Sequence, residues 1–356
     1  MTLNRYMFKE FIKGLIISLV ILVFIYIIID LFEDLGKYLE HHASILTIME
    51  FYLYQSIPYA ILLLPVAAML GTFYSLGLMA RNNELISLKT SGIPMVKIFL
   101  IFPIIGLLLV IASFVTNEYL GTWANHNLRS VREVKILKRK KRTFRMRNFF
   151  YLSPYGKLYR IRSLDVASGK IIGFYLWDVD DQLRIRRTIV ARSGSYNGSW
   201  KLYDVTERIF NEDSEELNHY DTLRTGLIPE TPEELAKSPK PMLEMQTGEL
   251  FYEIRRRRLT GADVKEEAVE FNYRFSSPFI NLILILMAIP FALRLKRGGL
   301  ALGIGIGIIV AFIYWGLIQT FRAYGIGGMM SPFLSAWFPN FIFGTIVIIS
   351  YLGIER

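Results

Sequence analysis

The chain has 356 residues, of which 53% are hydrophobic and only 20% are charged, and its formal net charge is +10. A soluble chain of this length usually carries about a quarter charged residues and divides into two domains. It contains no cysteine, which excludes disulfides, thiol catalysis and zinc–thiolate sites.

Apolar residues are concentrated in six windows, each long enough to cross the hydrocarbon core of a bilayer, which takes about 20 residues. The first window is too long for a signal peptide and is not followed by a small-residue cleavage site. We therefore predict a helical membrane protein with three spans on either side of one extramembrane domain. The windows are residues 11–32, 51–79, 98–118, 275–293, 300–320 and 335–353.

The distribution of basic residues predicts the orientation. Six spans place both termini on one side, and the short segments on that side are richer in lysine and arginine than the opposite short loops. By the positive-inside rule the termini are cytoplasmic and the large domain lies outside the cytoplasm. Ten basic residues from Arg129 to Arg147 argue against this orientation, because they lie in the domain that it places outside the cytoplasm. Long loops, however, are largely exempt from the rule.

The large domain has the pattern of antiparallel β structure. Apolar side chains occupy every second position in residues 158–162, 183–190 and 200–205, and Gly, Asn, Asp and Ser punctuate these stretches. About six short strands without intervening helices indicate a sandwich or half-barrel. Thr231, with Glu234 three residues later, predicts a capped helical turn. We expect three parts: residues 1–120 with three spans, 121–248 with the β domain, and 249–356 with connecting helices and three spans.

Residues 81–92 predict a short helix in a cytoplasmic loop. Asn82 or Asn83 can cap its start, and Gly92 followed by Pro94 ends it. One interpretation is an amphipathic helix lying on the membrane surface. The other is a helix that docks into a groove of a partner protein. Glu84 favours the partner, because the cytoplasmic membrane surface is itself negative.

Residues inside the membrane give weaker signals. Gly299, Gly303 and Gly307 form a face that lets another helix approach closely, either within this subunit or at a mobile seam between subunits. Asp30 and Lys37 lie at the outer end of the first span, where extension of the side chains to water is the default interpretation. No metal site is expected from His41 and His42, which have no third ligand nearby.

Several catalytic patterns are absent from the sequence. There is no phosphate-binding Gly-x-x-x-x-Gly-Lys-[Ser/Thr] loop, no Gly-x-Ser-x-Gly, no His-Glu-x-x-His and no dinucleotide fingerprint. We therefore expect neither catalytic residues nor an ATP site in this chain. The spans are also poor in buried acids, which disfavours an ion-coupled pump, so energy for uphill transport would come from a partner.

Four stretches in this order resemble the LptF/LptG permeases, which extract lipopolysaccharide from the bacterial inner membrane. They are Asn4-Arg-Tyr, residues 78–92, residues 249–278 and residues 332–340. The similarity covers essentially the whole chain and is somewhat closer to LptG than to LptF. It implies a transmembrane α-helical fold with an inserted periplasmic jellyroll-like domain.

The resemblance also implies partners. The chain would pair with an LptF-like paralogous permease on an LptB-like ATPase dimer, which binds the ATP and magnesium, and this chain would bind no cofactor. Its jellyroll would pass lipopolysaccharide to LptC and LptA along a bridge of strand edges. No nucleic acid partner is expected.

The resemblance assigns residues to two sites. Glu84 would contact the ATPase, with Arg81, Leu85 and Leu88 on the same helix. The first and fifth spans would line a lateral gate, which includes Gly299, Gly303 and Gly307. Family members often carry a lysine for lipid phosphate where this chain has Asp30, so Lys37 or the basic cluster would take that part. We expect the cluster to meet phosphate through Lys138, Arg139, Lys140, Lys141 and Arg142; a solvated strip, or contact with ordinary anionic phospholipid, is the alternative.

Three other functions compete with lipopolysaccharide extraction. One is a different ABC-type permease or mechanotransmitter, in which no lipid crosses the subunit. Another is a membrane receptor or scaffold with a β-sandwich sensor domain and no ATPase. A membrane enzyme ranks last, because no catalytic groups converge.

Overall fold

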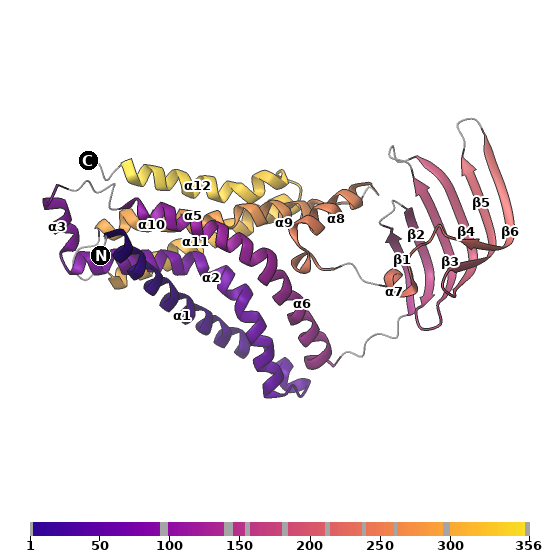
Figure 1. Cartoon of the computed structure of the whole chain (residues 1–356), viewed down its shortest axis with the longest axis horizontal. Helices are drawn as coiled ribbons and strands as arrows, with labels where there is room; N and C mark the ends of the chain where they lie inside the picture. The colour runs from indigo at the N-terminus through magenta and orange to yellow at the C-terminus, as the bar shows by residue number, and fades with distance from the viewer. Residues whose placement is uncertain are drawn as a thin grey trace. The chain divides into compact units, whose positions relative to one another are not determined.

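The computed structural model describes residues 3–92, 99–138, 145–153, 157–179, 184–210, 214–236, 240–259, 262–294 and 300–352. The chain divides into two compact units (Figure 1). A helical unit contains Met1–Lys138, Met242–Leu250 and Lys265–Arg356, and a sheet unit contains Arg139–Pro241 and Phe251–Val264. The sequence placed the start of the inserted domain at residue 121, whereas the sheet unit begins at Arg139. It placed the end of the domain at residue 248, close to Met242, where the chain returns to the helical unit.

Five helices of the helical unit are long and apolar enough to cross a membrane, and a bent pair makes a sixth if it is one span. They are α1 (Leu3–Glu40), α2 (Ile45–Arg81), the continuous helix from Ile101 to Ile136, α11 (Leu300–Ile326) and α12 (Pro332–Leu352). The bent pair is α9 (Lys265–Ser276) with α10 (Phe279–Arg294), which meet at 46°. The predicted helical fold with an inserted domain is thus confirmed: three candidate spans precede the insertion, and two follow it, or three if the bent pair is one span.

The third long helix continues well beyond the apolar window. It consists of α5 (Ile101–Thr116), the π-helical segment η1 (Asn117–Gly121), α6 (Thr122–Ser130) and the π-helical segment η2 (Val131–Ile136). Ala124, Leu128 and Val131 recur at helical spacing and are all buried. Leu128 and Val131 pack with aromatic residues of α1 and α2, so tertiary packing extends the helix where hydropathy ends.

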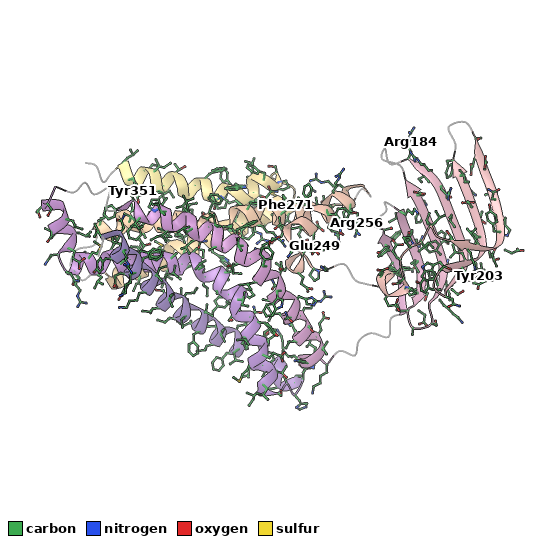
Figure 2. All side chains as sticks on the ribbon, viewed as in Figure 1. Arg184, Tyr203, Glu249, Arg256, Phe271 and Tyr351 are labelled. Carbon is green, nitrogen blue, oxygen red and sulfur yellow. The ribbon has the colours of Figure 1, made fainter. Side chains whose placement is uncertain are left out.

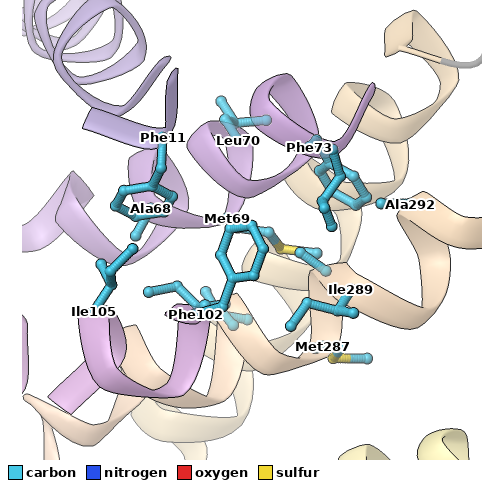
Figure 3. Close-up of a cluster of buried hydrophobic side chains, with 14 of the residues drawn as sticks. Phe11, Ala68, Met69, Leu70, Phe73, Phe102, Ile105, Met287, Ile289 and Ala292 are labelled. Atoms are coloured by element: carbon cyan, nitrogen blue, oxygen red, sulfur yellow. The ribbon is translucent and has the colours of Figure 1, made fainter. Parts of the chain in front are cut away.

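One hydrophobic core holds the helical unit together. Figure 3 shows part of it, where Phe11 of α1 and Phe73 of α2 lie near Phe102 of α5 and Ile289 of α10. Phe11, Phe102 and Ile289 are fully buried. Tyr351 near the end of α12 (Figure 2) donates a hydrogen bond to the Leu286 carbonyl of α10 at 3.3 Å. The same core takes in the short helix α3 (Glu84–Thr90).

The sheet unit is a single antiparallel sheet with its strands in chain order, β1 to β6. This arrangement confirms the all-β domain and follows an up-and-down path, without the crossovers of a Greek key. The strands are β1 (Arg145–Leu152), β2 (Lys157–Asp165), β3 (Lys170–Val179), β4 (Ile185–Tyr196), β5 (Trp200–Phe210) and β6 (Glu215–Thr225). One face is buried around Tyr159, Phe174 and Trp200.

A capped turn closes the buried face of the sheet. In α7 (Pro232–Leu235) Thr231 and Glu234 form the predicted capping box, and Leu235 packs into the sheet core. Just before it, the carboxylate of Glu230, which is 5% exposed, accepts hydrogen bonds from Ser153 and, at 3.2 Å, from Tyr159. The Trp200 indole donates to the Glu230 carbonyl at 2.7 Å. The chain then passes through η3 (Met242–Glu244) into α8 (Thr247–Leu259).

Candidate functional site

The short helix α3 is anchored to the helical core by its apolar residues. Leu85 is 8% exposed and belongs to the same core as Met79 of α2, and Leu88 packs against that core. Asn83 at the start of the helix has φ 60°, and Gly92 beyond its end has φ 74°, which glycine adopts without strain. The side chains presented to solvent include Arg81 and Ile86, which is 61% exposed. Leu85 thus holds the helix, and Ile86 is the apolar group left accessible to a partner.

The Glu84 carboxylate is oriented by the chain itself. The Tyr6 hydroxyl of α1 and the Asn82 side-chain amide each donate to Glu84 Oε1 at 3.2 Å. Both of these hydrogen bonds end on the same carboxylate oxygen, Oε1. In the sequence, Tyr6 belongs to the Asn4-Arg-Tyr motif. Its contact with Glu84 could not be predicted, because nothing local in the sequence links residues so far apart.

Asp30 lies in a cluster of tyrosines between α1 and α2. Its Oδ2 accepts a hydrogen bond from the Tyr52 hydroxyl at 2.9 Å, and the hydroxyls of Tyr52 and Tyr38 are 3.2 Å apart. Tyr59, whose ring contacts that of Tyr26, lies on the same helix as Tyr52. Within the described residues, Asp30 has no ion-pair partner. Sequence reasoning missed these tyrosines, since only the packing of two helices brings them to the aspartate.

Lys37 and much of the basic cluster are engaged with acids. Lys37 lies 2.5 Å from Asp34, although its side chain is 60% exposed. Arg132 is 3.8 Å from the same Asp34, and Lys135 is 2.6 Å from Glu50 of α2. The pair of Lys37 with Asp34 lies within α1, whereas Arg132 and Lys135 tie η2 to α1 and α2 respectively.

Lys138 is the one member of the expected phosphate-binding group whose place the structure describes. Its Nζ donates to the His42 carbonyl at 3.5 Å, and its backbone has φ 45°. Arg139, Lys140, Lys141 and Arg142 lie outside the described residues.

The glycine face of α11 packs against α2 of the same chain. A Cβ at Gly307 would stand 3.2 Å from Phe73 Cε2 and 3.6 Å from Leu70 Cδ2. Gly303 is also buried, and Gly299 lies outside the described residues. Gly307 therefore serves close packing within this subunit. Elsewhere α1 and α11 each leave a broad apolar face exposed, as Phe24 at 63% and Phe312 at 72% illustrate.

A buried polar network fixes the returning chain to the helical unit. Arg274 of α9 is 5% exposed and donates to the carbonyls of Met242 and Met245 at 2.6 and 2.7 Å. Glu270 bridges Arg274, at 3.8 Å, and Arg322 of α11, at 2.5 Å. Both Glu270 and Arg274 lie in a stretch that carried the family resemblance, but the sequence did not reveal that they are paired.

The same return segment is also tied to the third long helix. Glu118 of η1 accepts from the Thr247 backbone at 2.8 Å and from its hydroxyl at 2.5 Å. Glu244 lies 3.1 Å from His126 and 3.4 Å from Arg129. His126 thus has a carboxylate partner, and among the described residues no group of three His, Asp or Glu is placed to hold a metal ion.

A second motif of the resemblance forms another buried link. Asn340 of α12 donates to the Ser276 carbonyl at 2.8 Å and accepts from the Tyr314 hydroxyl at 2.5 Å. Three helices of the second half, α9, α11 and α12, are therefore held by one asparagine.

A comparison with family models decides the family. The model described as lipopolysaccharide export system permease LptF/LptG matches residues 5–352. The chain belongs to the LptF/LptG family. No curated protein matches the chain. Membership in the LptF/LptG family supports a role as a lipopolysaccharide export permease, a transport subunit rather than a catalytic one. The inserted sheet domain and the apolar helices agree with the fold of such a permease.

Proposed function

We propose that the chain is the transmembrane permease subunit of an ATP-driven ABC transporter that extracts lipopolysaccharide from the bacterial inner membrane. The observation that carries this proposal is the geometry of α3. Leu85 anchors the helix in the core, Tyr6 and Asn82 orient Glu84, and Ile86 stays exposed. A helix held this firmly can transmit force from a partner to the spans.

The energy source is a partner ATPase, an LptB-like dimer that supplies ATP and magnesium binding, while this chain holds no cofactor of its own. Glu84 and Arg81 provide charged contacts to that partner, and Ile86 provides an apolar one. Leu85 and Leu88 act indirectly, by fixing the helix. Tyr6 lies at the start of α1, so a push on α3 reaches the first span directly.

The orientation places the termini and α3 in the cytoplasm and the sheet unit in the periplasm. Figure 1 supports this arrangement, because α3, the start of α1 and the end of α12 lie at one end of the helical unit. Arg5 and Lys9 in the first turns of α1, and Arg81 just before α3, belong to that same end, as the positive-inside rule requires.

The lipid path is proposed to run along α1 and α11. Both helices pack on α2 and expose apolar faces, which fit acyl chains or the LptF-like paralogue that completes the transporter. Gly307 lets α11 lie close to α2, and Gly303 and Gly299 continue the same spacing in the sequence. At the outer end, Asp30 and Lys37, together with Lys138 and the basic residues 139–142, meet the lipid headgroup.

The sheet unit is proposed to pass the lipid to the LptC and LptA bridge. Its strands β1 and β6 are the two edges of an open sheet, and β6 is exposed along most of its length. An open edge has unpaired backbone groups, to which a strand of another protein can add.

The test is a mild-detergent affinity purification of the tagged protein, with all co-purifying chains identified. We expect an ABC ATPase and a second six-span permease with the wild type, and loss of the ATPase alone from Glu84→Arg. The control is Glu233→Arg, which reverses an exposed acid on α7 of the sheet unit. A wild type that is purified alone, or with signalling proteins, would overturn the proposal in favour of a receptor or scaffold.

A further inference from the structure

Asp30 stands at the boundary of the apolar part of α1. No charged residue occurs between Lys13 and Asp30. A helix rises about 1.5 Å per residue, so the two lie roughly 26 Å apart along the axis, close to the thickness of a hydrocarbon core. Asp30 is therefore placed at the level of the headgroups of one leaflet, which is the outer leaflet in the orientation proposed above.

The acids near this end of α1 differ in how they are neutralised. Asp34 is paired with both Lys37 and Arg132. Asp30 accepts a hydrogen bond from the Tyr52 hydroxyl at 2.9 Å, and within the described residues it has no lysine, arginine or histidine as an ion-pair partner. Hydroxyl donors orient a carboxylate but leave its charge, and an ionisable group at membrane depth usually has a cationic partner or a function.

Aromatic rings complete the surroundings of this carboxylate. Tyr26 lies one helical turn before Asp30, on the same face of α1, and is 39% exposed. Its ring is 4.5 Å from that of Tyr59. A carboxylate beside an exposed aromatic ring, here that of Tyr26, attracts an ammonium group through its charge and through cation–π attraction. A divalent ion instead needs six or more oxygen ligands.

We propose that Asp30 and Tyr26, with Tyr52 orienting the carboxylate and Tyr59 packed against the Tyr26 ring, form a site for the primary ammonium group of a lipid headgroup. The site rests on the proposed function, because it uses the outer leaflet and the lipid path along α1. It deepens that function by naming the substrate chemistry: a lipid that carries an amine beside its phosphate. The amine belongs either to the exported lipopolysaccharide or to the phosphatidylethanolamine of the membrane.

The experiment uses the purified transporter, with its ATPase and paralogous permease, in lipid nanodiscs. In one arm the discs are phosphatidylglycerol, and the probe is lipopolysaccharide with or without phosphoethanolamine substituents. In the other arm the discs contain or lack phosphatidylethanolamine, and no lipopolysaccharide is added. Native mass spectrometry measures bound lipid, and the arm that shows an amine preference identifies the source.

The wild type is expected to bind the amine-bearing lipid roughly tenfold more tightly than its amine-free counterpart, as for one charged hydrogen bond. Asp30→Asn is expected to abolish this preference, and Tyr26→Leu to reduce it severalfold. Tyr52→Phe should reduce the preference less than Asp30→Asn does, because it removes an orienting hydroxyl and leaves the charge. The control is Glu33→Gln, which neutralises an exposed neighbouring acid and should change nothing.

The site would be overturned if the wild type showed no preference, or if Asp30→Asn kept the preference unchanged. It would also be overturned if Asp30→Asn lost the paralogous permease, because Asp30 would then be a contact between subunits. Equal losses in Asp30→Asn and Tyr52→Phe would assign Asp30 a purely structural link between α1 and α2. Absence of the ATPase and the second permease, seen before lipid is added, would instead refute the proposed function.

Discussion

The Tyr6 hydroxyl in the first turns of α1 donates a hydrogen bond to Glu84 Oε1 at the start of α3, at 3.2 Å. These residues belong to two elements that are joined only through the whole of α2. The bond connects the helix proposed to contact the ATPase with the span proposed to line the lipid path. The fixed position of Glu84 is thus a property of α1 as well as of α3.

Tyr6→Phe should weaken this connection without unfolding the protein. A single hydrogen bond of this kind is worth about 1 kcal/mol, so we expect roughly a fivefold loss in the affinity of the ATPase for the permease. Titration of the ATPase against the reconstituted permease measures the effect. Tyr351→Phe, which removes a hydroxyl bonded elsewhere in the helical unit, is the control. An affinity identical to that of the wild type would show that the bond does not position Glu84.

Gly307 should tolerate only small side chains. Gly307→Leu places a branched side chain against Phe73 and Leu70, and overpacking of this kind costs about 1–3 kcal/mol. Thermal unfolding of the purified complex is expected to show a lower Tm. Gly305→Leu is the matched control on the same helix, because nothing lies within 4 Å of a Cβ built there. Equal effects of the two variants would refute close packing of α11 on α2 at Gly307.

Arg274 should be required to hold the returning chain. Arg274→Ala leaves Glu270 short of a buried partner and removes the side-chain donor to the Met242 and Met245 carbonyls, of which the first keeps only the Met245 N–H, and this costs about 3–5 kcal/mol. We expect a lower Tm and faster limited proteolysis within Met242–Leu250. Arg274→Lys should restore little, since one ammonium cannot reproduce the planar fork.

The control for Arg274 is Arg208→Ala. Arg208 pairs with Glu215 at 3.5 Å, and both side chains are about half exposed, so the loss should be within about 0.5 kcal/mol. Proteolysis of the return segment at the wild-type rate in Arg274→Ala would mean that the bonds to Glu118 and Glu244 suffice.

The sheet unit should lose stability in alkaline solution. Burial, followed by the nearby Glu230 carboxylate, raises the pKa of Tyr159 above its ordinary value of about 10. A tyrosine whose pKa is raised in the folded state contributes stability that is full below pH 10 and is lost as the pH rises toward the folded pKa. We expect the fluorescence of buried Trp200 to report unfolding above about pH 10.

Tyr159→Phe should flatten this pH dependence, while lowering stability at neutral pH through loss of the bond to Glu230. Tyr203→Phe, at a partly exposed tyrosine on β5, should leave the alkaline profile as it is. A profile that is unchanged by Tyr159→Phe would assign the alkaline transition to another group.

Local patterns were sufficient for the elements of this fold. Long apolar windows predict spans because a bilayer demands unbroken runs, and alternation predicts β2, β4 and β5 because a strand turns every second side chain to one face. The turn at Thr231 was predicted together with its capping box, since both partners lie within four residues. Hydropathy alone ended the third span at Glu118, and only the structure shows that the helix continues, with Ala124, Leu128 and Val131 buried at helical spacing.

The sequence by itself determined the membrane class, the three-and-three arrangement of spans, the all-β insertion and, through its motifs, the family. Only the tertiary structure decided which groups meet: Tyr6 with Glu84, Arg322 with Glu270, Tyr52 with Asp30, and Gly307 with Phe73. The reason is physical. Periodicity and turn chemistry act over a few residues, whereas these contacts join separate helices, whose packing depends on the shapes of all their side chains at once.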